Sequence, residues 1–107
     1  MKTFFSSMFI ENEKLVEAEI NYPIKLEYYK IINEDEITKQ EGIKFGIYIV
    51  KTEYKKEKVK IEDKIIQYVS NDERKIEEIL NTLKRNEVPP VTAEEILREL
   101  SQKTIML

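Results

Sequence analysis

Apolar side chains alternate most regularly along residues 42–50. Every second position carries a β-branched or aromatic residue, so in an extended chain these side chains share one face. That face carries Ile43, Phe45, Ile47 and Ile49, and the other carries Lys44, Gly46, Tyr48 and Val50. Gly42 stands where a turn would end. The pattern predicts the central strand of a small sheet.

A second alternating run follows Pro23, whose missing amide proton disfavours it inside a strand. Its mainly apolar face carries Ile24, Leu26, Tyr28, Lys30 and Ile32, and its mixed face carries Lys25, Glu27, Tyr29 and Ile31. The acidic run at residues 33–36 ends this strand, or residues 37–39 extend it to a turn at residues 40–42. In both versions the connection is too short for a helical crossover, which favours an antiparallel hairpin.

A third strand is expected after a turn near residues 54–57. Val59 and Ile61 then return beside the central strand and are assigned to its buried face. The intervening positions Lys58, Lys60 and Glu62 point the other way, as suits an exposed edge that must not pair with another chain. These runs form a meander with the central strand in the middle.

The first residues are harder to assign to an element. Residues 1–20 are expected to form an N-terminal arm or an extra strand, and residues 21–107 a single α+β domain. Weak alternation over residues 15–21 favours a short strand. The apolar side chains of residues 1–13 either cover their own domain or form an arm that docks on a partner.

From Ser70 onward the apolar period changes from two to 3.6 residues, which is typical of helices. Residues 70–73 have the S-x-x-E spacing of a capping box, and residues 92–95 repeat it as T-x-x-E after a proline-rich connector. The second helix is expected to end near Gln102. The apolar positions of the two helices are Ile76, Ile79, Leu80, Leu83, Ile96, Leu97 and Leu100.

The order of elements predicts an α+β fold: an antiparallel β-meander of three to four strands, packed on one face by a C-terminal helical hairpin. The helices should cover the face that carries Ile24, Leu26, Tyr28, Ile43, Phe45, Ile47, Ile49, Val59 and Ile61. On this assignment, Ile47→Asp is expected to unfold the domain.

Composition removes several function classes. The chain of 107 residues contains no cysteine and no histidine, which excludes thiolate sites and the commonest general base and metal ligand. The net charge of −3 gives no global attraction to nucleic acid or anionic lipid. No apolar run approaches the ~20 residues that cross a bilayer. The protein is expected in the cytoplasm, without a membrane, metal or cofactor partner.

The ordered features include a Tyr-Tyr strand, the run Gly46-Ile47-Tyr48-Ile49-Val50, a capped helix and a Val-Pro-Pro-Val link before a short helix. Together they resemble a family of small proteins from Firmicute bacteria that is classed as a domain of unknown function. The resemblance covers roughly residues 24–100 and leaves residues 1–20 outside. It implies no activity, cofactor or catalytic residues.

Carboxylate pairs are the remaining candidates for catalysis or cation binding. They are Glu34/Asp35/Glu36, Glu62/Asp63, Asp72/Glu73 and Glu94/Glu95. Among 21 acidic residues such neighbours arise by chance. The first two groups lack the loop spacing of a calcium site, and the last two pairs already have roles at helix starts. The serines have no histidine to activate them, and no glycine-rich phosphate loop is present. We therefore expect no enzyme activity and no catalytic residues.

The second face of the sheet is the main candidate for function. It should present Tyr29, Ile31, Gly46, Tyr48 and Val50, with a shallow dip at Gly46 beside Tyr48. Three interpretations remain open. Residues 1–20 cover this face, or a protein partner or second copy does. Alternatively the aromatic rings stack on RNA bases, although the consensus motifs of that fold are missing.

A lysine-rich hairpin offers a separate nucleic-acid alternative. Residues 43–66 hold seven lysines against four acids, and the candidate patch is Lys51, Lys55, Lys56, Lys58 and Lys60. Protection of an exposed strand edge explains the same lysines without a ligand. The sequence therefore favours a non-enzymatic protein-interaction or regulatory module that self-associates through the open sheet face, with nucleic-acid binding as the alternative.

Overall fold

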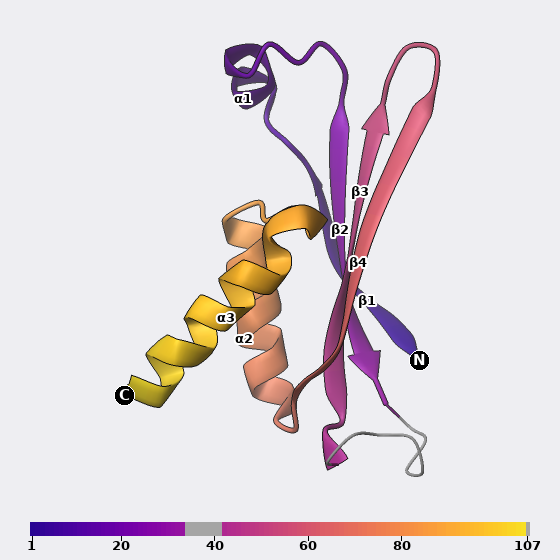
Figure 1. The fold of residues 1–107 in the computed structure, drawn as a ribbon. Helices are drawn as coiled ribbons and strands as arrows, with labels where there is room; N and C mark the ends of the chain where they lie inside the picture. The colour runs from indigo at the N-terminus through magenta and orange to yellow at the C-terminus, as the bar shows by residue number, and fades with distance from the viewer. Residues whose placement is uncertain (34–41, 107) are drawn as a thin grey trace.

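The computed structural model describes residues 1–33 and 42–106. Within these ranges, four antiparallel strands form one sheet in the order β1-β2-β3-β4, and three helices accompany them (Figure 1). The strands are β1 (Lys2–Phe9), β2 (Ile24–Ile32), β3 (Phe45–Tyr54) and β4 (Val59–Ser70). The helices are α1 (Asn12–Glu17), α2 (Glu73–Arg85) and α3 (Pro90–Met106). The expected α+β meander with two C-terminal helices is confirmed.

The domain has two layers, because α2 and α3 lie against the same side of the sheet (Figure 1). Alternation in β2 and β3 directs one set of side chains toward these helices, as the sequence predicts. Within the described ranges, no helix covers the opposite side. The buried core consists of Leu26, Tyr28, Ile47, Ile49, Ile76, Leu80, Leu83, Val88, Ala93 and Leu97.

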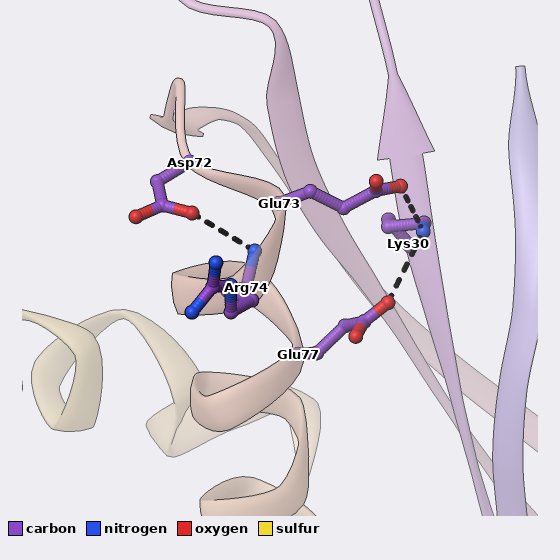
Figure 2. Close-up of polar contacts among 5 residues, drawn as sticks. All are labelled: Lys30, Asp72, Glu73, Arg74 and Glu77. Carbon is purple, nitrogen blue, oxygen red and sulfur yellow. Dashed lines mark hydrogen bonds and ion pairs between the residues drawn. The ribbon is translucent and has the colours of Figure 1, made fainter.

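The start of α2 is fixed both by a cap and by the sheet (Figure 2). The carboxylate of Asp72 accepts a hydrogen bond from the amide of Arg74, so Asp72 is the N-cap rather than the expected Ser70. Lys30 of β2 points toward the helices, and its ammonium lies 2.5 Å from Glu73 and 3.6 Å from Glu77. These acids lie in the first turns of α2, where negative charge is favourable.

Residues 12–17 form a helix where a strand over residues 15–21 was expected, and that prediction is wrong. The amides of Leu15 and Ala18 donate to the carbonyl oxygens of Glu11 and Lys14, which closes one helical turn after another. Leu15 is buried whereas Val16 is 68% exposed. A single buried residue suffices to anchor so short a helix, and alternation over a few residues does not separate it from a strand.

Val59 and Ile61 do not belong to the buried face, and their assignment to the core is wrong. The β3–β4 hairpin pairs Val59 with Tyr54 and Ile61 with Thr52, so all four side chains point away from the helices. Val59 and Ile61 are 52% and 64% exposed. The hairpin register decides the face, and one residue of shift reverses it.

α3 begins at Pro90, two residues before the expected Thr92 cap. Proline is favoured at the first helical position because that position needs no amide donor and its fixed φ suits a helix. The helix continues to Met106, past the expected end near Gln102. No helix in the described parts of the chain has the length and apolarity to cross a bilayer.

Candidate interaction face

We use the term open face for the side of the sheet turned away from α2 and α3. On the central strands it presents Lys25, Glu27, Tyr29, Ile31, Gly46, Tyr48, Val50 and Thr52. On the edge strands it presents Lys2, Phe4, Ser7 and Phe9 from β1, with Val59, Ile61, Asp63 and Ile65 from β4.

A row of apolar and aromatic side chains crosses all four strands of the open face. Tyr29 pairs directly with Phe4 on one side and with Tyr48 on the other, and Tyr48 pairs with Ile65. The ring centroids of Phe4 and Tyr29 lie 5.6 Å apart in an edge-to-face arrangement, and those of Tyr29 and Tyr48 lie 5.5 Å apart. Contacts of this kind stabilise a sheet. They also fix the row as a rigid platform.

Both tyrosine hydroxyls of this row are satisfied within the sheet. Tyr29 donates to the carboxylate of Glu27 at 3.0 Å, and Tyr48 donates to Asp63 at 2.8 Å. Partial burial, followed by the hydrogen bond to Glu27, raises the pKa of Tyr29. The hydrogen bond to Asp63 is the main reason why the pKa of Tyr48 is raised. The row therefore offers rings rather than free hydroxyl donors.

Lys2 shapes one corner of the candidate face. Its ammonium lies 4.0 Å from the ring centroid of Tyr48, two strands away, so its side chain passes over β2. Ile31, which pairs with Lys2, is only 3% exposed. Of the predicted face, Tyr29, Tyr48 and Val50 remain partly accessible, whereas Ile31 is buried.

Gly46 does not leave the dip that the sequence suggested. A Cβ atom built on Gly46 would lie 2.3 Å from the carbonyl oxygen of Gln67 and 2.4 Å from that of Ile66. The pairing of β3 with β4 is irregular between Phe45 and Ile47, and here the β4 backbone occupies the space. Gly46 is buried and serves close strand packing.

Sequence reasoning missed the most accessible apolar residues of the open face. Phe4 and Phe9 are 55% and 58% exposed, and Ile65 is 46% exposed. Together with Val59 and Ile61 they lie on the two edge strands, on either side of Tyr29 and Tyr48. The alternation of residues 2–9 and 59–65 carried the signal, but only a known register tells which alternate set faces outward.

The N-terminal segment extends the open face instead of covering it. β1 joins the sheet as an edge strand beside β2, with a bulge between Phe4 and Ser6. The bulge turns Phe5 toward the core, where Met8 also packs. Among residues 1–20, the part that crosses the open face is the Lys2 side chain. Self-covering by this segment is therefore wrong as an account of the face.

The alternative basic patch is largely neutralised by neighbouring acids. Lys51 and Lys55 lie 3.1 Å and 3.6 Å from the carboxylate of Glu53, and Lys60 lies 3.1 Å from Glu62. Lys56 and Lys58 complete the predicted patch and lie at the exposed tip of the hairpin. Charge that is paired inside the protein contributes less to the binding of phosphates.

A model of the family of unknown function DUF6514 matches residues 7–103. The chain belongs to the DUF6514 family. The predicted resemblance to a domain of unknown function is thereby confirmed, and the match begins well before residue 24. The last three residues of β1, together with α1, therefore lie within the DUF6514 region. No curated protein and no solved structure matches the chain.

The acidic pairs of this DUF6514 member are separated by the fold. Glu62 pairs with Lys60 while Asp63, on the opposite face of β4, accepts from Tyr48. Asp72 caps α2, Glu73 pairs with Lys30, and Glu94 lies 3.3 Å from Lys64. The run Glu34/Asp35/Glu36 lies outside the described residues. Over the described ranges, no three acidic side chains gather as a metal site requires.

Acidic residues of the DUF6514 domain do border one cavity, of about 510 Å³, between β4 and the start of α3. Glu62, Asp63 and Glu94 contribute to its lining, together with Lys64 and the apolar Ile61, Pro90 and Val91. Glu62 and Glu94 are each held by a lysine and Asp63 by a tyrosine. Each of the three acids is thus already in contact with a side chain of the protein itself.

Proposed function

We propose that this protein is a non-enzymatic interaction module that binds another protein through its open face. The proposal rests on one observation, the row from Phe4 through Tyr29 and Tyr48 to Ile65, framed by exposed apolar side chains. Solvated sheet faces ordinarily carry polar residues at such positions. Contiguous exposed apolar and aromatic surface marks interaction sites.

The chemistry of the open face favours protein over nucleic acid as the partner. On the open face the carboxylates of Glu27 and Asp63 offset the ammonium groups of Lys2 and Lys25, so these charges give no net positive surface to attract phosphates. The hairpin lysines are offset by Glu53 and Glu62 on the helix side. Rings with satisfied hydroxyls and exposed aliphatic side chains suit an apolar protein surface.

The proposed setting is the cytoplasm, and its support is compositional. The chain has no cysteine, so its stability does not depend on an oxidising compartment. A regulatory role also belongs to this proposal, because the open face offers a contact surface for another protein.

A comparison of two double variants in native lysate tests the proposed function. Tagged wild type is compared with Tyr29→Ser/Tyr48→Ser and with Lys75→Ser/Glu78→Ser, a control on α2. We expect the wild type and the control to retain a partner that the tyrosine variant loses, because the variant breaks the ring row. Circular dichroism and thermal melting establish that each variant is folded. Retention of every partner by a folded tyrosine variant would overturn the proposal.

A further inference from the structure

We infer that the partner of the open face is a second copy of this chain, packed face to face about a two-fold axis that crosses the strands between Lys25 and Glu27. This inference rests on the proposed function and deepens it by naming the partner. A two-fold interface must be self-complementary, because every contact occurs twice with the roles exchanged. The open face meets this condition in both its charges and its apolar side chains.

The charges of Lys25 and Glu27 are complementary to their own copies across such an axis. Lys25 and Glu27 lie two positions apart on β2, both half-buried and both on the open face. An axis between them places Lys25 of one copy over Glu27 of the second copy, and Glu27 over the second copy's Lys25. Two ion pairs of opposite charge then form by symmetry. Such complementarity fixes the register of an interface.

The same axis matches the apolar positions. On β3 it passes between Val50 and Thr52, the partners of Glu27 and Lys25. It therefore sets Tyr48 against the second copy's Tyr54. On β4 it passes between Asp63 and Ile61, which sets Ile65 against the second copy's Val59. Tyr54, Val59 and Ile65 are 39%, 52% and 46% exposed, so each loses apolar surface to water on pairing.

The tyrosine hydroxyls of the face do not oppose this burial. The hydroxyls of Tyr29 and Tyr48 already donate to Glu27 and Asp63, so pairing leaves neither donor without an acceptor. Asp63 lies on the edge strand, opposite the second copy's Ile61 in this register, and its carboxylate keeps the hydrogen bond from the Tyr48 hydroxyl. Ser7 and Thr52 are small enough to allow close approach of the two sheets.

The area predicts a modest affinity. Four strands about 4.8 Å apart, over roughly eight residues at about 3.3 Å each, give the sheet a flat area of ~500 Å². The projecting side chains add to this area. A standard interface buries about 800 Å² per partner, so this one lies toward the weaker end. We expect a dissociation constant on the order of 1–100 μM.

Sedimentation equilibrium on charge-reversed variants tests the inference. We expect purified wild type to dimerise, and Lys25→Glu and Glu27→Lys each to weaken dimerisation at least tenfold, because each sets like charges together twice. An equimolar mixture of the two variants should regain a dimer, since every crossed pair is then of opposite charge. Lys75→Glu and Glu78→Lys make the same charge changes on α2 and should dimerise as the wild type does.

The outcomes separate this inference from the proposed function. The second copy is not the partner in this register if the wild type stays monomeric at concentrations well above the expected dissociation constant. The same holds if the mixture of the two variants does not regain a dimer. In that case, loss of a lysate partner by the folded Tyr29→Ser/Tyr48→Ser variant still supports an open-face module that binds a different protein. Retention of all lysate partners together with a monomeric wild type overturns both.

Discussion

The hydroxyl of Tyr28 donates a hydrogen bond to the carbonyl oxygen of Val88 at 2.9 Å, which joins β2 to the turn between α2 and α3. The same hydroxyl lies 3.3 Å from the carbonyl oxygen of Leu83, the last buried residue of α2. Tyr28 is fully buried, and this burial raises the pKa of its hydroxyl far above the usual range. One core side chain thus ties the sheet to the end of α2 and to the turn that leads into α3.

Tyr28→Phe is expected to lower the free energy of unfolding by about 1–3 kcal/mol, because it leaves a buried carbonyl without its donor. Chemical denaturation at equilibrium measures the change. Tyr54→Phe removes a hydroxyl from an exposed ring and should stay within about 0.5 kcal/mol of wild type. Equal effects of the two substitutions would contradict a structural role for the Tyr28 hydroxyl.

The alternation of residues 24–32 and 45–50 was enough to predict the central strands and the face that each side chain occupies. Ile43 and Lys44 were also assigned to the central strand, and that part is wrong, because β3 begins at Phe45. Leu26, Tyr28, Ile47 and Ile49 are buried against α2 and α3 as expected. Period-two patterning carries this information because neighbouring positions of a strand necessarily point to opposite faces. The predicted helix positions Ile76, Leu80 and Leu83 are likewise in the core.

The same alternation could not predict which face each side chain of the edge strands occupies. Which face Val59 and Ile61 occupy depends on how many residues form the β3–β4 turn, and the observed pairing of Tyr54 with Val59 fixes it. The backbone approach at Gly46 and the bulge after Phe4 are tertiary features without a periodic signal. The candidate site was therefore predicted at its centre, in Tyr29 and Tyr48, and missed at its rim.

Opposite outcomes are expected for the same substitution at Ile47 and at Ile61. Ile47 is fully buried, so Ile47→Asp places an unpaired charge in the core and should unfold the domain. Ile61 is 64% exposed on the open face, so Ile61→Asp should change the free energy of unfolding by no more than about 0.5 kcal/mol. Thermal melts followed by circular dichroism, at concentrations below self-association, compare them. A wild-type melt for Ile47→Asp would contradict the core assignment.

Substitution of the two glycines should separate steric crowding from backbone conformation. Gly46→Ala forces a methyl group against the β4 carbonyls and should cost about 1–3 kcal/mol or more. Gly42 has open space around it but a φ of +73°, so Gly42→Ala should cost about 1 kcal/mol. Asparagine tolerates positive φ, so Gly42→Asn should cost less than Gly42→Ala. At Gly46, asparagine should be worse than alanine, and denaturant titration of the four variants tests this order.

Glu53 is a buried carboxylate whose loss of hydration is offset by nearby donors and positive charges. It is 6% exposed, accepts a hydrogen bond from the Tyr22 hydroxyl at 3.1 Å and lies 3.1 Å from the ammonium of Lys51. Burial alone would raise the pKa of Glu53. The hydrogen bonds from Lys51 and Tyr22 and the charge of Lys55 outweigh it, so that the pKa falls below its ordinary value of 4.5.

The lowered pKa of Glu53 gives its stabilisation a defined pH dependence. Because the unfolded chain holds this proton more tightly, the contribution is complete above the ordinary pKa of 4.5 and is lost as the pH falls through the lower folded pKa. We expect Glu53→Gln to be less stable than wild type at about pH 7, and the difference to shrink toward about pH 3. Urea midpoints at both pH values measure it, with Glu57→Gln at the exposed hairpin tip as the control. A Glu53→Gln deficit that stays constant with pH would show that the carboxylate charge contributes nothing.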